Sequence, residues 1–514
     1  MRGFIMSAAL GTMIAAFAGS APAGQGANIV CVGAGPGCLP TIEAGIAAAR
    51  DGDTVRLDRG TFRGGVTIDK SVRVEGAGAD ATKIEGGGPV ITIAVGAQKA
   101  LTVTIAAVTI TGGATSTNPT GRCGADVPTC GPGYLRATAL GGGIEIAPGA
   151  SAGGATVTIR SSVITGNRAQ PSTTVPSVVA RCPGGPCPFA QAGGGGIDNW
   201  GALTLVDTTV SDNVAGGGVT AQADGGGILD ESGSRLSLVN STVKGNRASV
   251  SAPNGRFANG GGIYEFGGRI LDIRGSTVSA NRAEGAFAAP ASVDVNVACA
   301  GICIEEGTVA TIRGSTIGGN VVAGSNSKGN GVFCGAGIST GEGGSFLLAG
   351  STVSNNRVIA SARSTAPTPG PFLACSAGMD LFAGKVTINN SRVVGNVAQA
   401  TTAAGAALVV GGAISPVSAN AVITASVFSG NRGVATSSKG SATVLGGAIA
   451  NGWRLVVRQT RVSGNVASAR ARGHTARGGG IYNGKIPDLD HLGNLTLVKS
   501  VVSRNRPDQC YACR

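Results

Sequence analysis

Short runs of alternating apolar and polar residues recur along most of this chain, separated by glycine, serine or asparagine. One unit shows the pattern. A glycine cluster ends at Ile263, an alternating segment follows over 270–273, and Ser276, Thr277 and Val278 lead to Asn281. Alternation with a period of two predicts half-buried β-strands, and the glycine and asparagine positions predict tight turns. The chain is therefore expected to consist of many short strands.

This unit occurs ten times between residues 141 and 506. Each copy has an asparagine, an apolar residue three positions before it, and serine or threonine five positions before it. The asparagines are Asn167, Asn213, Asn246, Asn281, Asn320, Asn356, Asn396, Asn431, Asn465 and Asn505. Such repetition indicates a solenoid in which like residues stack about 4.8 Å apart. We predict that valine and isoleucine fill a narrow core, and that the asparagines form a structural ladder.

The repeats predict an all-β parallel β-helix solenoid of about 12 rungs. A single domain is expected over 24–514, with an N-terminal cap and the first rungs at 24–112, the ten repeats at 141–506 and a tail at 507–514. Two rungs per repeat is an alternative, but one rung is favoured. The segment between each asparagine and the next glycine cluster varies in length, which predicts a surface loop that carries partner specificity.

Residues 41–50 predict a short helix before the first strands. Thr41 can cap it, and Ile42, Ile46 and Ala49 share one face. A helix at this place would cover the open end of the strand stack, where backbone groups are otherwise unpaired.

Composition narrows the picture further. Glycine accounts for 89 of 514 residues, charged residues for only 13% and aromatic residues for 4%, so the core is expected to be aliphatic and thin. The first residues have the features of a secretory signal peptide, with Arg2, an apolar run over 4–18 and small residues at 21–23. We predict cleavage near Ala23, with an uncleaved anchor as the alternative, and a location that is extracellular or associated with the cell envelope.

Twelve cysteines in an exported chain suit disulfide bonds. The expected pairs are Cys31 with Cys38, Cys123 with Cys130, Cys182 with Cys187, Cys334 with Cys375, and Cys510 with Cys513. Cys334 and Cys375 occupy equivalent positions in neighbouring repeats, so stacking would place them within disulfide distance. Metal binding is an alternative for the C-x-x-C at Cys510, and the pairing of Cys299 and Cys303 stays open.

The chain resembles the right-handed parallel β-helix, or pectin-lyase-like, superfamily. Its start, with Gly52-Asp53-Thr54-Val55 and Gly60-Thr61-Phe62 after the short helix, is similar to the start of many such proteins. The repeats resemble those of polymorphic outer-membrane proteins, known for G-G-A-I and F-x-x-N, which occur here at 411–414, 446–449 and 428–431. Those proteins end in an autotransporter barrel, and no such barrel is expected here. The resemblance implies a secreted bacterial β-helix and little about activity.

Acidic residues follow the glycine clusters in four successive repeats, with aromatic residues beside them. These candidate substrate-binding residues are Asp198, Trp200, Asp230, Glu265, Phe266 and Glu305. Carboxylates one or two rungs apart would lie about 5 or 10 Å from each other, near the separations found in glycosidases. The competing interpretation is that they are solvated residues on an outward face. The motifs of polygalacturonases are absent, so no catalytic residue is assigned.

Arginine follows the asparagine in six repeats, at Arg168, Arg247, Arg282, Arg357, Arg432 and Arg506. In a chain of net charge +13, an outward-facing arginine column could contact acidic polymers. The alternative is that these arginines only keep a strand edge soluble. Aromatic residues do not interleave with them, so nucleic acid is not an expected partner.

We therefore expect a secreted, non-catalytic protein that binds glycan or a cell-surface polymer, with adhesin-like or envelope-associated character. The alternative is a polysaccharide lyase or glycoside hydrolase that acts on acidic polysaccharide. No cofactor or metal is expected, and calcium enters only under the lyase alternative. No membrane-spanning segment is expected in the mature chain.

Overall fold

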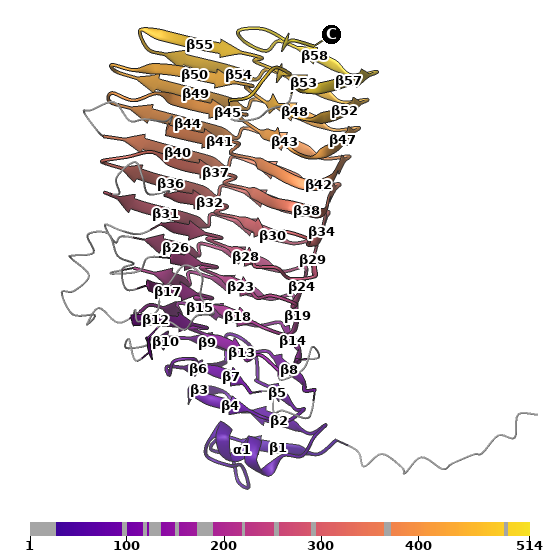
Figure 1. Ribbon diagram of the computed structural model, residues 1–514. Helices are drawn as coiled ribbons and strands as arrows, with labels where there is room; N and C mark the ends of the chain where they lie inside the picture. Colours follow the sequence, from indigo (N-terminus) through magenta and orange to yellow (C-terminus); the bar gives the residue numbers. More distant parts are fainter. Residues whose placement is uncertain are drawn as a thin grey trace, which may run out of the picture.

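The chain folds into a parallel β-helix, which confirms the predicted fold class (Figure 1). The computed structural model describes residues 27–94, 100–116, 121–122, 135–149, 154–171, 189–217, 222–250, 256–288, 295–363, 372–487 and 492–513. The predicted signal peptide lies outside these residues. In the described part of the chain no helix is both long and apolar enough to cross a membrane.

Each repeat is one rung that passes through five strand positions in a fixed order. In one rung these are β28 (Ile263–Glu265), β29 (Ile270–Arg274), β30 (Thr277–Ser279), β31 (Arg282–Phe287) and β32 (Asn296–Ala298). Ile263 of this rung pairs with Ile302 of the next, so the preference for one rung per repeat is confirmed. The stacked strands form five ladders, numbered 1 to 5 in the same order.

Ladders 1 and 2 belong to one sheet, because the long strands β38 (Ile338–Ala349) and β42 (Met379–Asn389) run through both. The other strands of ladder 1 are β4 (Val66–Ile68), β7 (Ile91–Ile93), β13 (Ile144–Ile146), β18 (Ile197–Asn199), β23 (Ile228–Asp230), β28, β33 (Ile302–Ile304), β46 (Ile414–Pro416), β51 (Ile449–Ala450), β56 (Ile481–Tyr482) and β59 (Cys510–Tyr511). Those of ladder 2 are β1 (Ile29–Val32), β2 (Thr54–Leu57), β5 (Arg73–Glu75), β8 (Thr102–Ala106), β14 (Thr156–Arg160), β19 (Ala202–Val206), β24 (Arg235–Val239), β29, β34 (Val309–Arg313), β47 (Asn420–Thr424), β52 (Arg454–Arg458) and β57 (Asn494–Val498).

The other three ladders are separate sheets. Ladder 3 contains β3 (Gly60–Arg63), β6 (Thr82–Glu85), β9 (Thr109–Thr111), β15 (Val163–Thr165), β20 (Thr209–Ser211), β25 (Thr242–Lys244), β30, β35 (Thr316–Gly318), β39 (Thr352–Ser354), β43 (Arg392–Val394), β48 (Val427–Ser429), β53 (Arg461–Ser463) and β58 (Val501–Ser503). Ladder 4 contains β10 (Ala114–Thr115), β16 (Arg168–Ala169), β21 (Val214–Gly216), β26 (Arg247–Val250), β31, β36 (Val321–Asn326), β40 (Arg357–Ala362), β44 (Val397–Thr402), β49 (Arg432–Ser437) and β54 (Val466–Arg470). Ladder 5 contains β11 (Gly121–Arg122), β12 (Leu135–Leu140), β17 (Phe189–Gly193), β22 (Gln222–Asp224), β27 (Phe257–Asn259), β32, β37 (Gly331–Cys334), β41 (Phe372–Cys375), β45 (Ala407–Val410), β50 (Ser441–Leu445) and β55 (Gly473–Arg477).

The main core lies between ladders 1, 2 and 3. Alternate residues of each strand point into it, such as Ile263, Leu271, Ile273 and Val278, all with no exposed surface. In a parallel stack each of these residues meets its counterpart in the next rung, so β-branched and leucine side chains form continuous apolar columns.

The ten asparagines form a buried hydrogen-bonded ladder at the turn after ladder 3. In the first nine, Nδ2 donates to Oδ1 of the asparagine in the following rung at 2.9–3.0 Å. The backbone N–H of each asparagine donates to the same oxygen, as at Asn281 and Asn320. Close approach of glycine makes room for this ladder, because a Cβ on Gly262 would lie 2.9 Å from Nδ2 of Asn281.

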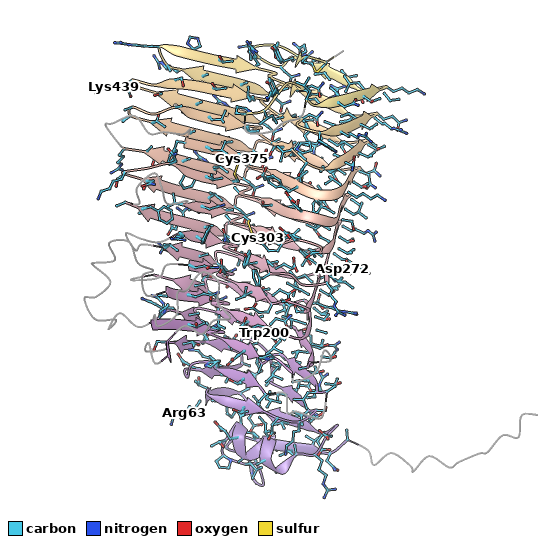
Figure 2. All side chains as sticks on the ribbon, in the orientation of Figure 1. Arg63, Trp200, Asp272, Cys303, Cys375 and Lys439 are labelled. Carbon is cyan, nitrogen blue, oxygen red and sulfur yellow. A yellow bond between two sulfur atoms is a disulfide. The ribbon has the colours of Figure 1, made fainter. Side chains whose placement is uncertain are left out.

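The segment after each asparagine is not the surface loop that the sequence analysis predicted. It forms the strands of ladders 4 and 5, which pack face to face around a second core of small side chains such as Ala248, Ala258, Val297 and Ala398. Figure 2 shows Lys439, in the turn between β49 and β50, at the outer edge of this extension. The length variation that suggested loops lies in the connections between ladders 4 and 5.

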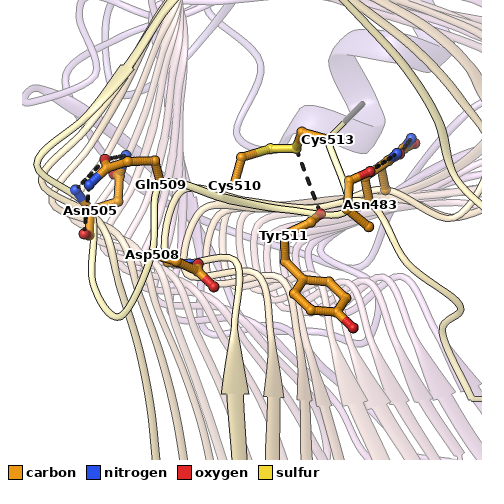
Figure 3. The surroundings of a disulfide bond; sticks show 10 residues. Asn483, Asn505, Asp508, Gln509, Cys510, Tyr511 and Cys513 are labelled. Carbon is orange, nitrogen blue, oxygen red and sulfur yellow. Dashed lines mark hydrogen bonds between the residues drawn. A yellow bond between two sulfur atoms is a disulfide. The ribbon is translucent and has the colours of Figure 1, made fainter.

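Helix α1 (Ile42–Ala48) covers the N-terminal end of the main core, whereas the last rung leaves the core residue Leu497 41% exposed. The helix begins at Thr41, whose side chain accepts a hydrogen bond from the Ala44 N–H, and it buries Ile42 and Ile46 in the core. At the other end, Gln509 Oε1 accepts from the backbone N–H and Nδ2 of Asn505, at 3.0 and 3.2 Å (Figure 3). The glutamine amide thus takes the place that an eleventh asparagine would occupy.

Four disulfide bonds lie within the described residues. Their Cα–Cα distances are 4.6 Å for Cys31–Cys38, 5.0 Å for Cys299–Cys303, 4.5 Å for Cys334–Cys375 and 5.8 Å for Cys510–Cys513. Cys510 and Cys513 are thus paired as a disulfide bond, in place of the alternative of metal binding at this C-x-x-C. The predicted pairs Cys123–Cys130 and Cys182–Cys187 lie outside the described residues.

The asparagine ladder yields a stability prediction. Asn320→Ala removes four side-chain hydrogen bonds in the middle of the ladder and leaves buried partners unpaired. Since each unpaired buried group costs about 1–3 kcal/mol, we expect a loss of about 3 kcal/mol or more in the free energy of unfolding, measured by urea denaturation. Thr316→Ala, an exposed change in the same rung, is the control and should cost less than about 0.5 kcal/mol. Equal losses for the two variants would contradict a stabilising ladder.

Candidate functional site: a groove between two ladders

The glycine turn between ladder 5 and ladder 1 places the outer faces of these two ladders against each other along the molecule. The second residue of each ladder 1 strand from β13 to β56 points into the angle between the two ladders, which we call the groove. These floor residues are Glu145, Asp198, Leu229, Tyr264, Cys303, Ser339, Asp380, Ser415, Ala450 and Tyr482. Figure 2 shows Trp200, Cys303 and Cys375 one above another along its course.

The groove differs in character along its length. Toward the C-terminal end, apolar residues such as Leu408, Val410, Leu445 and Tyr482 pack together and fill it. In the middle it opens into a pocket of about 390 Å³. The pocket is the part of the groove in which a ligand can be accommodated.

The pocket combines aromatic rings with amide groups. The aromatic residues that line it are Phe257, Tyr264 and Phe382, and the amide side chains are Gln222, Asn259 and Asn296. The Tyr264 hydroxyl donates to Glu305 Oε1 at 2.8 Å, which fixes both groups at the pocket wall. Oδ1 of Asn296 is buried and makes no hydrogen bond within the described part of the chain. Rings for stacking and amides for hydrogen bonding are thus present side by side.

Asp224 lies behind the amide wall and holds it in place. Its carboxylate accepts from Gln222 Nε2 at 2.6 Å and from Asn259 Nδ2 at 3.3 Å. Burial raises the pKa of Asp224 to about 8, although these two hydrogen bonds oppose the rise. The group is therefore mostly protonated near neutral pH, and it positions two of the pocket amides.

The structure does not bring the four predicted carboxylates together on one face. Asp198 pairs in register with Leu229, whereas Asp230 pairs with Asn199 on one side and Glu265 on the other. Asp198 therefore belongs to the groove floor, while Asp230 and Glu265 occupy the next strand position, at the corner between ladders 1 and 2. Glu305 follows the end of β33 and lines the pocket.

The interpretation of these acids as solvated surface residues is also wrong for three of them. Asp198, Asp230 and Glu265 have no exposed surface, because neighbouring rungs and turns cover them. Burial raises the pKa of Asp198 and Asp230 well above the usual range, and it raises the pKa of Glu265. A substrate cannot touch these carboxylates in this structure, so they do not form an accessible catalytic pair.

The two predicted aromatic residues lie near the acids but outside the pocket. Trp200 Nε1 donates to Asp198 Oδ2 at 3.2 Å. Phe266 is 48% exposed, and its ring lies 5.9 Å from that of Tyr264, between centroids. Only Glu305 among the six candidate residues lines the pocket.

Two disulfide bonds lie in the middle of the groove. Cys299–Cys303 ties the end of ladder 5 to the floor, and Cys334–Cys375 joins two neighbouring ladder 5 strands. Asp380 lies close to the second bond, accepts from the Ser415 hydroxyl, and has its pKa raised to about 6 by burial. Because the sulfur atoms are bonded to each other, these cysteines are not free to act as thiolate ligands of a metal.

The arginines that follow the asparagines form one column on the outer face of ladder 4. Arg247 pairs in register with Arg282, and valines occupy the intervening positions of the column. The arginine side chains are exposed, but Glu284 forms ion pairs with both Arg247 and Arg282. The column is therefore partly neutralised at its centre.

Sequence reasoning missed the pocket residues of ladder 5. Gln222, Asp224, Phe257 and Asn259 fall in a segment that was interpreted as loop. The sequence feature that could have identified them is the alternation in Gln-Ala-Asp and Phe-Ala-Asn, just before the glycine clusters. In each triplet, a buried alanine separates two residues on the groove side. Three-residue alternations of this kind are too short to identify a strand in isolation.

Comparison of the chain with protein-family models, with curated proteins and with solved structures finds no match. The site must therefore be interpreted from its own geometry.

The raised pKa of Asp224 predicts a pH dependence of stability. A carboxyl whose pKa is raised by folding binds its proton more tightly in the folded protein. Its contribution to the free energy of unfolding is therefore complete below about pH 4 and is lost as the pH rises through about 8. We expect wild-type stability to fall over this range in thermal melts, and Asp224→Asn to flatten the fall. Glu306→Gln, an exposed change, should leave the profile unaltered, and a D224N profile parallel to wild type would contradict the assignment.

Proposed function

We propose that the protein binds glycan chains through the pocket in the middle of the groove, without itself transforming them. The observation that carries this proposal is the combination of three aromatic rings with three amide side chains in one pocket. Aromatic rings can pack against the apolar faces of sugar rings, and amides can both donate to and accept from sugar hydroxyls.

The charges around the pocket favour a neutral or amino-bearing glycan over an acidic one. The chain as a whole carries a net charge of +13, yet no arginine or lysine is among the described residues that line the pocket, and Glu305 is. A polysaccharide rich in carboxylates would therefore meet negative charge and find no cation to pair with.

The lyase or hydrolase alternative receives less support. The pair of carboxylates that would act on a glycosidic bond must reach the substrate, and Asp230 and Glu265 are both fully buried. Binding by a rigid scaffold needs no such contact.

An extracellular or cell-envelope location belongs to the same proposal. The four disulfide bonds of the described residues suit an oxidising compartment, and the sequence of the first 23 residues has the features of an export signal. Glycans and envelope polymers are abundant in that environment.

The binding proposal is tested with oligosaccharides of three charge types. We expect neutral cello-oligosaccharides or amino-bearing chitosan oligosaccharides to bind in calorimetric titrations, and oligogalacturonate to bind weakly or not at all. Phe257→Ala or Phe382→Ala should weaken binding about tenfold or more, since a buried aromatic ring contributes about 1.5–3 kcal/mol.

Phe266→Ala is the matched control, because this phenylalanine is exposed beside Tyr264 but does not line the pocket. It should leave the affinity within about twofold, a change of roughly 0.4 kcal/mol. Preferential binding of oligogalacturonate, or an equal loss in all three phenylalanine variants, would contradict the proposal.

A further inference from the structure

The third residue of each ladder 1 segment, counted from its first core residue (Ile228 or Ile263, for example), points into the corner between ladders 1 and 2, and several rungs place a polar side chain there. We call the stack of these side chains the corner column. Where two asparagines are neighbours in it, one donates to the other, as Asn451 Nδ2 does to Asn483 Oδ1 at 2.7 Å. Asn199 Nδ2 likewise donates to Asp230 Oδ1 in the following rung. At these two steps, the polar side chains find hydrogen-bond partners within the column itself.

The step from Asp230 to Glu265 breaks this pattern. The two residues pair in register in neighbouring rungs, and ionised carboxylates only accept hydrogen bonds. Asp230 Oδ2 and Glu265 Oε1 are buried and make no hydrogen bond of ordinary geometry among the described residues, although the Gly268 N–H faces Glu265 and lowers its pKa. Both lie over the same glycine, since a Cβ on Gly268 would stand 3.2 Å from Asp230 Oδ2 and 2.4 Å from Glu265 Oε1.

A third buried oxygen joins the two carboxylates. The Ser234 hydroxyl is 2% exposed, faces Asp230 and lowers its pKa, yet its oxygen too makes no hydrogen bond of ordinary geometry. Neither carboxylate forms an ion pair with an arginine or lysine of the described ranges. Three unpartnered oxygens in one buried corner call for an ion, a water molecule or a proton between them.

We propose that Asp230 and Glu265 bind a calcium ion between their two rungs, with the Ser234 hydroxyl as a further oxygen ligand. Carboxylate and neutral oxygens are the ligands that Ca²⁺ takes in proteins, and the ion would compensate two charges that are otherwise buried close together. This inference does not depend on the glycan proposal.

The geometry gives such an ion a defined effect on the pocket. Glu265 Oε2 accepts from the Glu305 N–H at 3.2 Å and from the Thr308 hydroxyl at 2.6 Å. Glu305 in turn accepts from the Tyr264 hydroxyl at the pocket wall. An ion on the other oxygen of Glu265 would therefore fix the backbone from which two pocket groups project.

The test uses the full chain, treated with EGTA and then titrated with CaCl₂. We expect calorimetry to show about one bound ion per chain, and the melting temperature to rise by several degrees, because an ion that binds only the folded state stabilises it. Terbium, which replaces Ca²⁺, should show luminescence sensitised by the adjacent Tyr264 and be displaced by Ca²⁺. Asp230→Asn and Glu265→Gln should each abolish these responses.

Asp380→Asn is the matched control, since Asp380 is a buried carboxyl of the same ladder that points to the groove and is held by Ser415. It should retain the full Ca²⁺ response. The proposal fails if Ca²⁺ leaves the heat signal and melting temperature of wild type unchanged. It also fails if Asp230→Asn and Glu265→Gln both retain the full Ca²⁺ response, which would show that the ion binds elsewhere in the chain. Loss of glycan binding with an intact Ca²⁺ response would leave it standing.

Discussion

Side-chain amides bonded from rung to rung fix the register on which the rest of the molecule depends. A slip of one residue in any rung would turn its asparagine away from the column and leave buried donors and acceptors unpaired on both sides. Because the ladder sets one point of every rung, the aliphatic columns of the core and the residues of the groove floor follow in order. The repeat motif is thus structural, and the proposed glycan recognition depends on the positions that vary around it, such as Tyr264 and Phe257.

The second core explains why those variable positions form a surface of defined shape. Ladders 4 and 5 pack through alanine, valine and a few phenylalanines, which allows two sheets to lie close together without a wide interior. Ladder 5 then returns to ladder 1 at an angle, and disulfide bonds such as Cys299–Cys303 hold the two at the bend. The pocket is consequently lined by paired strands, so its amide and aromatic groups are held in place before any ligand arrives.

The sequence was sufficient for the architecture and insufficient for the site, for identifiable reasons. Ten repetitions of one spacing determine the stacking, and Thr41 with Ile42 and Ile46 determines the capping helix. Ladder 5 was missed because strands such as Gln222–Asp224 are short and follow connections of variable length. The faces of Asp198 and Asp230 were assigned wrongly because both follow a glycine cluster, yet they differ by one strand position, and a difference of one reverses the direction of a side chain.

The asparagine ladder also has a direction. Every Nδ2 donates one hydrogen to an amide oxygen of the following rung, and every Oδ1 accepts from the preceding one. The amide dipoles therefore add along the axis in the way that peptide dipoles add along a helix. One end of the stack presents only donors, and the other presents only an acceptor. Gln509 matters because it supplies a carbonyl oxygen at the donor end. Any strand that extended the stack beyond it would need to offer the same group, and two donor ends could not be joined to each other.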